Sequence, residues 1–242
     1  TSKLVEANKV YAVIVRFYLA DRYLYSDGSY GPRSQNSTKT PIAVIVAEHV
    51  AIALHDINEG GAEQLQWGSN TTSPETSRSC NNYADLFDIN QYGQADNATG
   101  AAKSAVSGYI PASPIIGQTW RVPTLVNFLQ MGITLGRMKE NSFEDYLNNQ
   151  GGYASFAPSG AAATGFSPAP STVNFPAMDM ARFKHAFEKE NGTAPSGTYW
   201  TGMECKVGSE YKMATIEISG GKFHLGLKSK TETAKVRPVI FY

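Results

Sequence analysis

A run of alternating side chains near the carboxyl end is the feature that most constrains the fold. Over residues 213–219, Ala and Ile alternate with Met, Thr, Glu and Ser, and a period of two is typical of a half-buried strand. Gly220 and Gly221 follow, and glycine reaches the positive φ angles of a tight hairpin turn without steric cost. Apolar alternation resumes over residues 223–227. The stretch therefore predicts an antiparallel hairpin.

Residues 236–242 predict a strand that closes the chain. The run is apolar and rich in Val, Ile, Phe and Tyr, but it contains Pro238. Proline has no N–H group to donate to a neighbouring strand, so it is confined to sheet edges and bulges. We therefore expect an antiparallel sheet at the carboxyl end, with this strand at an edge or a bulge.

Helical patterns are mixed with further strand patterns upstream, which predicts an α+β protein. Leu125, Phe128 and Leu129 have the 3/4 spacing of a helix that faces the core, and Pro123 precedes them, as is common at a helix start. The expected helices cover residues 99–107, 125–137, 142–149 and 178–190, with one turn at 83–87, and further strands are expected at 10–17, 41–46 and 49–56.

Three short motifs occur in a fixed order: Trp-Arg-Val-Pro-Thr at 120–124, Tyr-Trp-Thr-Gly-Met-Glu at 199–204 and Val-Arg-Pro-Val at 236–239. In this order and spacing they resemble bacterial C-type lectin-like domains of the FISUMP and Lcl type, which are related to the variable proteins of diversity-generating retroelements. The resemblance implies a twisted antiparallel sheet with flanking helices and long irregular loops. Gly202 and Met203 depart from the Ser-Thr that is usual in the family.

The resemblance covers residues 18–242 and divides the chain. Residues 1–17 contain one predicted strand, which is either the first strand of the lectin-like domain or the end of a preceding fimbrillin-like domain. Residues 151–176 are rich in Gly, Ala, Ser and Pro. Such a composition buries little apolar surface, so we interpret this stretch as a surface insert, with a functional lid as the alternative.

The resemblance also implies a function. Domains of this family occur in exported bacterial surface and fimbrial proteins, so we expect a ligand-binding, adhesin-like domain at the cell surface, associated with the outer membrane or extracellular. Its partner would be a glycan or the surface of a host or neighbouring protein. The alternative is an assembly subunit of a pilus or phage appendage, joined by strand addition. By position, the recognition surface would comprise Tyr199, Thr201, Glu204, Lys206, Glu210 and Tyr211.

A second candidate patch lies near the start of the lectin-like region. Asp27 and Gly28 predict a tight turn, with tyrosines on either side at Tyr25 and Tyr30. The segment resembles the Tyr-Tyr-Ser-Asp-Gly-Thr-Tyr stretch that opens members of the family. Tyr25, Asp27 and Tyr30 form either an exposed aromatic site or a hairpin whose tyrosines pack on the sheet.

Several function classes find no support in the sequence. Lys and Arg number 21, as do Asp and Glu, so no net charge attracts nucleic acid. No apolar run reaches the roughly 20 residues of a membrane-spanning helix. Motifs for a hydrolase nucleophile, a phosphate-binding loop and a zinc protease are missing, so we expect no enzyme, no cofactor and no metal site.

The histidines and cysteines leave structural roles open. His49 and His55 lack further metal ligands nearby in the sequence, so we interpret them as structural. Cys80 and Cys205 are compatible with one disulfide or with two free thiols, because pairing depends on geometry that the sequence does not contain.

Overall fold

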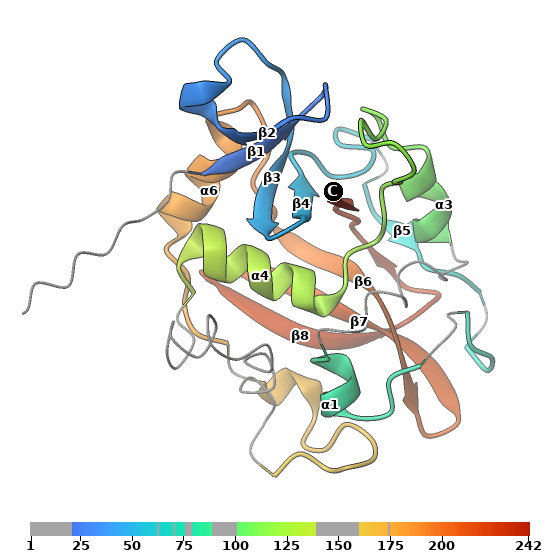
Figure 1. Ribbon diagram of the computed structural model, residues 1–242. Coiled ribbons are helices and arrows are strands. Elements are labelled where there is room, and N and C mark those ends of the chain that lie inside the picture. Colours follow the sequence, from blue (N-terminus) through green and yellow to red (C-terminus); the bar gives the residue numbers. More distant parts are fainter. Residues whose placement is uncertain are drawn as a thin grey trace, which may run out of the picture.

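The computed structural model describes residues 21–61, 63–69, 71–75, 79–88, 101–138, 160–173 and 175–242. Over these residues the protein is α+β, with antiparallel sheets and few helices, as predicted. Two sheets lie on either side of a central helix, α4 (Leu125–Gly136) (Figure 1). The expected strand at 10–17 and helix at 142–149 lie outside the described residues. None of the described helices has the length and apolar character that a membrane crossing requires.

The larger sheet has five antiparallel strands in the order β10–β4–β3–β1–β2. Strands β3 and β4 form the hairpin predicted from two apolar runs, with His49 in its turn at a φ of 58°. Strand β10 pairs with β4 rather than with the carboxyl-terminal hairpin, and it is an edge strand, as Pro238 predicts. The strands are β1 (Arg22–Tyr25), β2 (Tyr30–Pro32), β3 (Pro41–Ala47), β4 (Val50–Ala53) and β10 (Val239–Phe241).

The smaller sheet contains the predicted hairpin. Gly220 and Gly221 join β7 to β8 at φ angles of 56° and 76°, which confirms the turn. Met213 and Thr215 are buried although they point away from the expected core face. The middle of β7, residues 213–216, is therefore covered on both sides instead of being half-buried. The strands are β6 (Gly197–Val207), β7 (Glu210–Ser219) and β8 (Lys222–Ser229), and β5 (Leu65–Gln66) pairs separately with β9 (Thr233–Ala234).

Helix α4 begins with a reciprocal cap. Thr124 accepts a hydrogen bond from the Asn127 N–H through its hydroxyl, and the Asn127 side chain accepts one from the Thr124 N–H. This arrangement satisfies two backbone donors that a helix start leaves free. The other described helices are α1 (Tyr83–Leu86), α3 (Ala101–Ser107) and α6 (Met180–Glu188), with 3-10 turns at η1 (Arg33–Gln35) and η3 (Pro170–Thr172).

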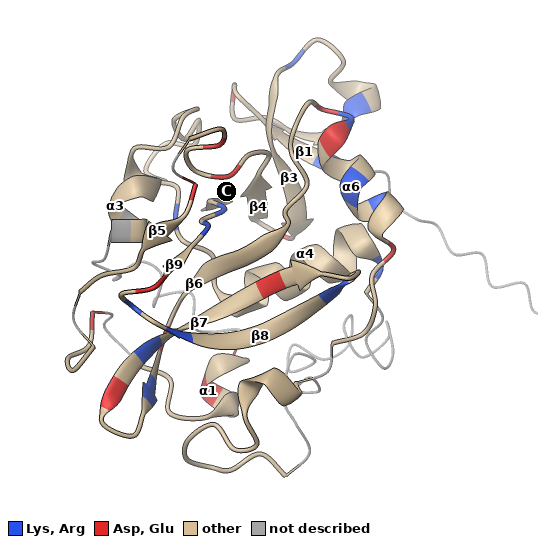
Figure 2. Ribbon diagram, turned by 180° about the vertical axis from the view of Figure 1, so that it is seen from behind, with Lys and Arg blue, Asp and Glu red and all other residues tan. Residues whose placement is uncertain are grey.

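Two apolar clusters fill the molecule. The first lies between the two sheets and includes Phe128 of α4. The second covers the opposite faces of the sheets and contains Trp67, Trp120 and Trp200, with the rings of Trp67 and Trp200 6.2 Å apart. Viewed from behind, cationic and acidic residues are interspersed along α6 and at the far end of the β6–β7 hairpin (Figure 2). Trp67 and Trp200 have no solvent exposure.

The stretch 151–176 buries more than its composition predicts. In its described part, Val173 and Phe175 belong to the first apolar cluster, and Phe175 is only 1 % exposed. The Tyr83 hydroxyl donates a hydrogen bond to the Pro168 carbonyl, and Phe166 packs edge-on against Tyr83. The other described residues of this stretch are exposed or half-buried, so this part lies at the surface, and Val173 and Phe175 anchor its end in the core.

Candidate ligand-binding surface

The six recognition residues predicted around β6 divide into a buried and an exposed group. Three have no solvent exposure and so belong to the interior rather than to a contact surface: Tyr199, Thr201 and Glu204. The other three lie where β6 turns into β7, with one of them half-buried: Lys206, Glu210 and Tyr211. Within the sheet, the Thr201 hydroxyl donates to the Ala214 carbonyl of β7, a structural use of that side chain.

Glu204 is the centre of a buried polar cluster. Its carboxylate accepts hydrogen bonds from the Glu75 backbone N–H at 2.9 Å, the Ser79 hydroxyl at 2.9 Å and the Lys230 ammonium group at 2.7 Å. Lys230 is itself fully buried and lies 5.7 Å from the centre of the Tyr211 ring. Because Glu75 and Ser79 lie far along the chain from Lys230 and β6, Glu204 holds residues 71–75 and 79–80 against the smaller sheet.

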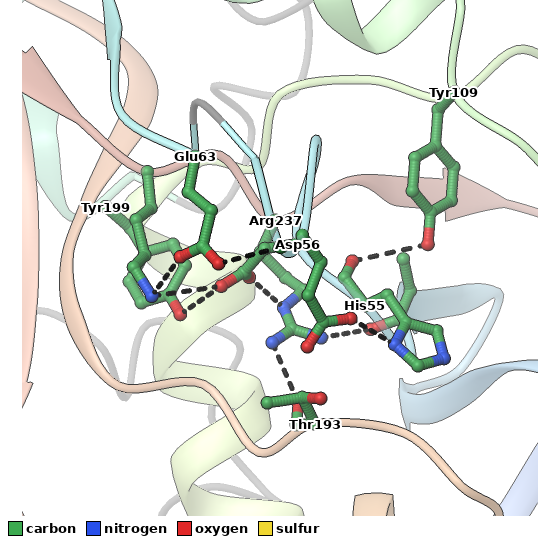
Figure 3. A network of polar contacts seen from close by, with 11 residues as sticks. His55, Asp56, Glu63, Tyr109, Thr193, Tyr199 and Arg237 are labelled. Carbon is green, nitrogen blue, oxygen red and sulfur yellow. Dashed lines mark hydrogen bonds and ion pairs between the residues drawn. The ribbon is translucent and has the colours of Figure 1, made fainter.

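Tyr199 belongs to a second buried network, shown in Figure 3. Its hydroxyl donates to Asp56 at 2.9 Å, and the Arg237 guanidinium pairs with the same carboxylate at 2.6 Å. Arg237 also donates to the carbonyls of Ala53 and Thr193. Burial, together with the Asp56 charge, raises the pKa of Tyr199. The network joins the end of β4, the start of β6 and the segment before β10, so its role is structural.

The three sequence motifs contact one another in the interior. A bulge in β6 between Trp200 and Glu204 brings the Gly202 N–H to the Pro123 carbonyl at 2.7 Å and Met203 against the start of α4. Arg121 and Val239 exchange two backbone hydrogen bonds, at 2.8 and 2.9 Å. The motifs at 120–124, 199–204 and 236–239 therefore hold the two sheets and α4 together.

The second predicted patch also divides. Tyr25 is fully buried, whereas Asp27 and Tyr30 are exposed. Asp27 accepts hydrogen bonds from the Ser29 hydroxyl at 2.6 Å and the Ser29 N–H at 3.0 Å, and it pairs with Lys39 at 3.0 Å. These bonds lower the pKa of Asp27 to about 2. The carboxylate thus stabilises its own turn, and Tyr30 is the member left on the surface.

Tyr30 lies in a surface group that we call the aromatic patch, formed by Arg22, Tyr30, His49 and Tyr242. The ring of Tyr242 lies 5.0 Å from that of Tyr30 and 5.8 Å from that of His49. The Arg22 guanidinium lies 5.6 Å from the centre of the Tyr30 ring. Tyr30 is 52 % exposed and the His49 side chain 68 %, so the patch offers ring surface to solvent.

The larger sheet assembles this patch. Arg22 and Tyr30 lie on the same face, because Tyr30 is opposite Leu24 and side chains two apart share a face. Tyr242 follows β10, and its N–H donates to the His49 carbonyl at 3.1 Å. A flat sheet would place β2 and β10 roughly 19 Å apart, so the twist of the sheet must bring its two edges toward each other.

Sequence reasoning missed most of this patch. Tyr30 was predicted, His49 was interpreted as structural, and Arg22 and Tyr242 were not singled out. Tyr242 lies more than 200 positions along the chain from Tyr30, and no local pattern relates two positions so far apart. Only the pairing of β10 with β4 brings them together.

His55 and Cys205 have different surroundings in the described part of the chain. His55 bonds Glu59 at the surface, whereas Cys205 is fully buried. A groove of about 420 Å³ beside α6 is lined by residues including Lys184, Glu188 and Ser196, with no histidine or cysteine among its described lining residues. No group of three His, Cys, Asp or Glu side chains suited to a metal ion occurs among the residues described.

The aromatic patch is a described surface at which exposed rings and charged groups coincide. A second is the β6–β7 turn, where Lys206 lies 5.9 Å from the centre of the half-buried Tyr211 ring. Glu48 adds a carboxylate, 3.7 Å from His49. Burial raises the pKa of the Tyr242 hydroxyl, which therefore stays protonated and able to donate a hydrogen bond at neutral pH. Comparison of the chain with protein-family models, with curated proteins and with solved structures found no match.

Proposed function

We propose that this chain is a non-catalytic, C-type lectin-like recognition domain of an exported bacterial surface or fimbrial protein, and that it binds a glycan through the aromatic patch. The observation that carries the proposal is the exposed Tyr30–Tyr242 pair, 5.0 Å between ring centres, with Arg22 against Tyr30. The order of the three motifs supports the lectin-like part of the proposal.

The chemistry of the patch suits a sugar. Pyranose rings present C–H groups on their faces, which pack on aromatic rings, and hydroxyl groups at their edges, which need donors and acceptors. Tyr30 and Tyr242 supply ring surface, while Arg22 donates and Glu48 accepts hydrogen bonds at the margin. A ligand would therefore find both kinds of contact within one sheet face.

The size of the patch favours a glycan over a protein. A stable protein interface covers about 800 Å² on each partner, around a packed apolar centre. The aromatic patch has four side chains, and two of them, Arg22 and His49, are basic. It has no apolar centre among its own members. Such a surface fits one or two sugar units, and repeated domains on a cell surface would raise a weak affinity by multivalency.

A glycan array followed by titration calorimetry tests the proposal. Removing one stacked ring costs about 1 kcal/mol, so Tyr30→Ala and Tyr242→Ala should each weaken binding about fivefold. The control is Tyr211→Ala, which removes a tyrosine at the distant β6–β7 turn and should leave the affinity unchanged.

The two tyrosine sites separate the candidate surfaces. If Tyr211→Ala abolishes binding and Tyr30→Ala has no effect, the site lies at the β6–β7 turn and the assignment to the aromatic patch is overturned. An array without any bound glycan, combined with specific binding to a surface protein, would replace the glycan by a protein ligand.

A further inference from the structure

Cys80 and Cys205 lie face to face in the interior. They form an isolated parallel bridge, in which the Cys80 N–H donates to the Glu204 carbonyl at 2.7 Å and the Cys80 carbonyl accepts from the Lys206 N–H at 2.9 Å. Both side chains have no solvent exposure, and both are thiols in this structure. The backbone therefore places the two sulfur atoms on the same side of one ladder, 125 positions apart in the chain.

This geometry fits a disulfide. Neighbouring strands lie about 4.8 Å apart, and the two Cα atoms of a disulfide lie about 4.4–6.8 Å apart. The cysteines occupy directly facing positions, so a bond between their sulfur atoms needs rotation of side chains and no shift in register. The bonds of Glu204 and Lys206 to the Cys80 backbone hold the two segments in this alignment.

The surroundings offer these thiols no other chemistry. Both belong to the first apolar cluster. Burial, followed by the contact with Cys80, raises the pKa of Cys205 well above its usual value, so a nucleophilic thiolate is disfavoured in the folded state. The described residues contain no cluster of His, Cys, Asp or Glu that would make them metal ligands.

We propose that Cys80 and Cys205 are joined by a disulfide when the protein folds in an oxidising compartment. A low-molecular-weight disulfide such as oxidised glutathione serves as oxidant. The Cys80 thiolate attacks one sulfur atom of oxidised glutathione and expels one glutathione thiolate. This step leaves a mixed disulfide between Cys80 and the other glutathione. The Cys205 thiolate then attacks the Cys80 sulfur and releases the second glutathione. Two protein thiols are oxidised, one disulfide is reduced to two thiols, and the two protons pass to the glutathione thiolates.

The bond would fasten a segment that otherwise depends on polar contacts. Residues 71–75 and 79–80 reach the smaller sheet through Glu204 and Lys230, and a disulfide would add a covalent link from Cys80 to β6. Because the folded protein buries both sulfur atoms, oxidation must occur before or during closure of the interior. The inference is independent of the glycan site, since no patch residue takes part.

The test uses the full chain, unfolded and reduced, then refolded in a buffer of reduced and oxidised glutathione. Thiols are counted with a maleimide reagent in denaturant, and the bond is mapped by mass spectrometry of non-reduced peptides. We expect no reactive thiol, an intact mass lower by two hydrogen atoms, and one peptide pair linking Cys80 to Cys205. A closed loop of this length should raise the melting temperature by about 10–20 °C over the reduced protein.

The double variant Cys80→Ala with Cys205→Ala is the matched control. Its melting temperature should not respond to the glutathione buffer, whereas that of the parent chain should rise. Two reactive thiols in the refolded, monomeric parent protein, or cysteines linked only between molecules, would overturn the proposal.

Discussion

Lys230 and Arg237 are the two cations that are fully buried in the described part of the chain. We expect the loss of Lys230 to destabilise the fold strongly. Its ammonium group donates to Glu204 at 2.7 Å and to the Ser73 carbonyl at 2.9 Å, and it lies 3.3 Å from Glu75. The side chains of Lys230 and Glu204 have no exposure, and that of Glu75 has 18 %. The substitution Lys230→Met would keep most of the side-chain volume and remove the charge between two carboxylates.

The expected cost follows from burial. Breaking a buried ion pair by removing one partner typically costs about 3–5 kcal/mol, because the other charge stays buried without compensation. For a chain of this size, each kcal/mol lowers the melting temperature by about 2–4 °C, so a fall of roughly 6–20 °C is expected. The hydrogen bonds that Glu204 keeps, from Glu75 and Ser79, favour the lower half of this range.

Urea unfolding followed by tryptophan fluorescence measures the effect, since Trp67 and Trp200 are buried in the native state. The matched control is Lys228→Met, which removes a cation from β8, two positions before Lys230. Lys228 pairs with Glu232 at 3.6 Å, and the two side chains are 32 % and 52 % exposed, so its loss should cost less than about 1 kcal/mol. Equal effects of the two substitutions would refute the argument from burial.

A double variant sharpens the same prediction. Adding Glu204→Gln to Lys230→Met neutralises the stranded carboxylate while keeping its shape, so the double variant should be more stable than the sum of the two single changes allows. Strict additivity would mean that Glu204 and Lys230 do not stabilise each other, whatever the 2.7 Å distance between them.

Two further perturbations test the packing and the turn chemistry. Gly132→Ala would put a Cβ atom 2.6 Å from the Phe223 ring. Overpacking costs about 1–3 kcal/mol and the gain in helix propensity is about 1 kcal/mol, so thermal unfolding should show a net loss of stability. Gly108→Ala should be neutral, because its Cβ atom would lie 3.8 Å from the nearest atom, the Ala105 carbonyl oxygen. The pKa of Asp27 is lowered from 3.8 to about 2, so the folded chain binds fewer protons between these pH values; stability should therefore fall as the pH drops from 3.8 to 2. The Ser29 amide resonance should titrate near pH 2 in NMR, and it should lose this titration in Asp27→Asn.

Much of the fold was predictable because its signals are local. The Gly220–Gly221 turn, the helix that follows Thr124 and the alternation in β7 each depend on neighbours within a few positions. The partner of the last strand was not predictable in this way. The edge preference of Pro238 was right, but the choice of β4 rather than β8 depends on how two whole sheets pack.

The candidate site was harder to predict for a related reason. Tyr199, Thr201 and Glu204 have the polar and aromatic chemistry of a binding site, yet each uses it on a partner inside the protein. Chemical type alone does not distinguish these two uses, because a buried polar group needs partners as much as a ligand does. The aromatic patch was missed for the opposite reason, since Tyr30 and Tyr242 meet only through tertiary structure.

The burial of the three motifs changes what their resemblance implies. Gly202 donates a backbone hydrogen bond to Pro123, and Arg121 and Val239 exchange two, so these residues are constrained by mutual contact. A resemblance at these buried motif positions concerns how two sheets pack around a helix. It carries no information about a ligand, because a ligand at the surface does not contact the buried motifs. Under the proposed function, specificity resides in surface side chains outside the motifs. For this reason the aromatic patch, which contains no motif residue, is the place to seek it.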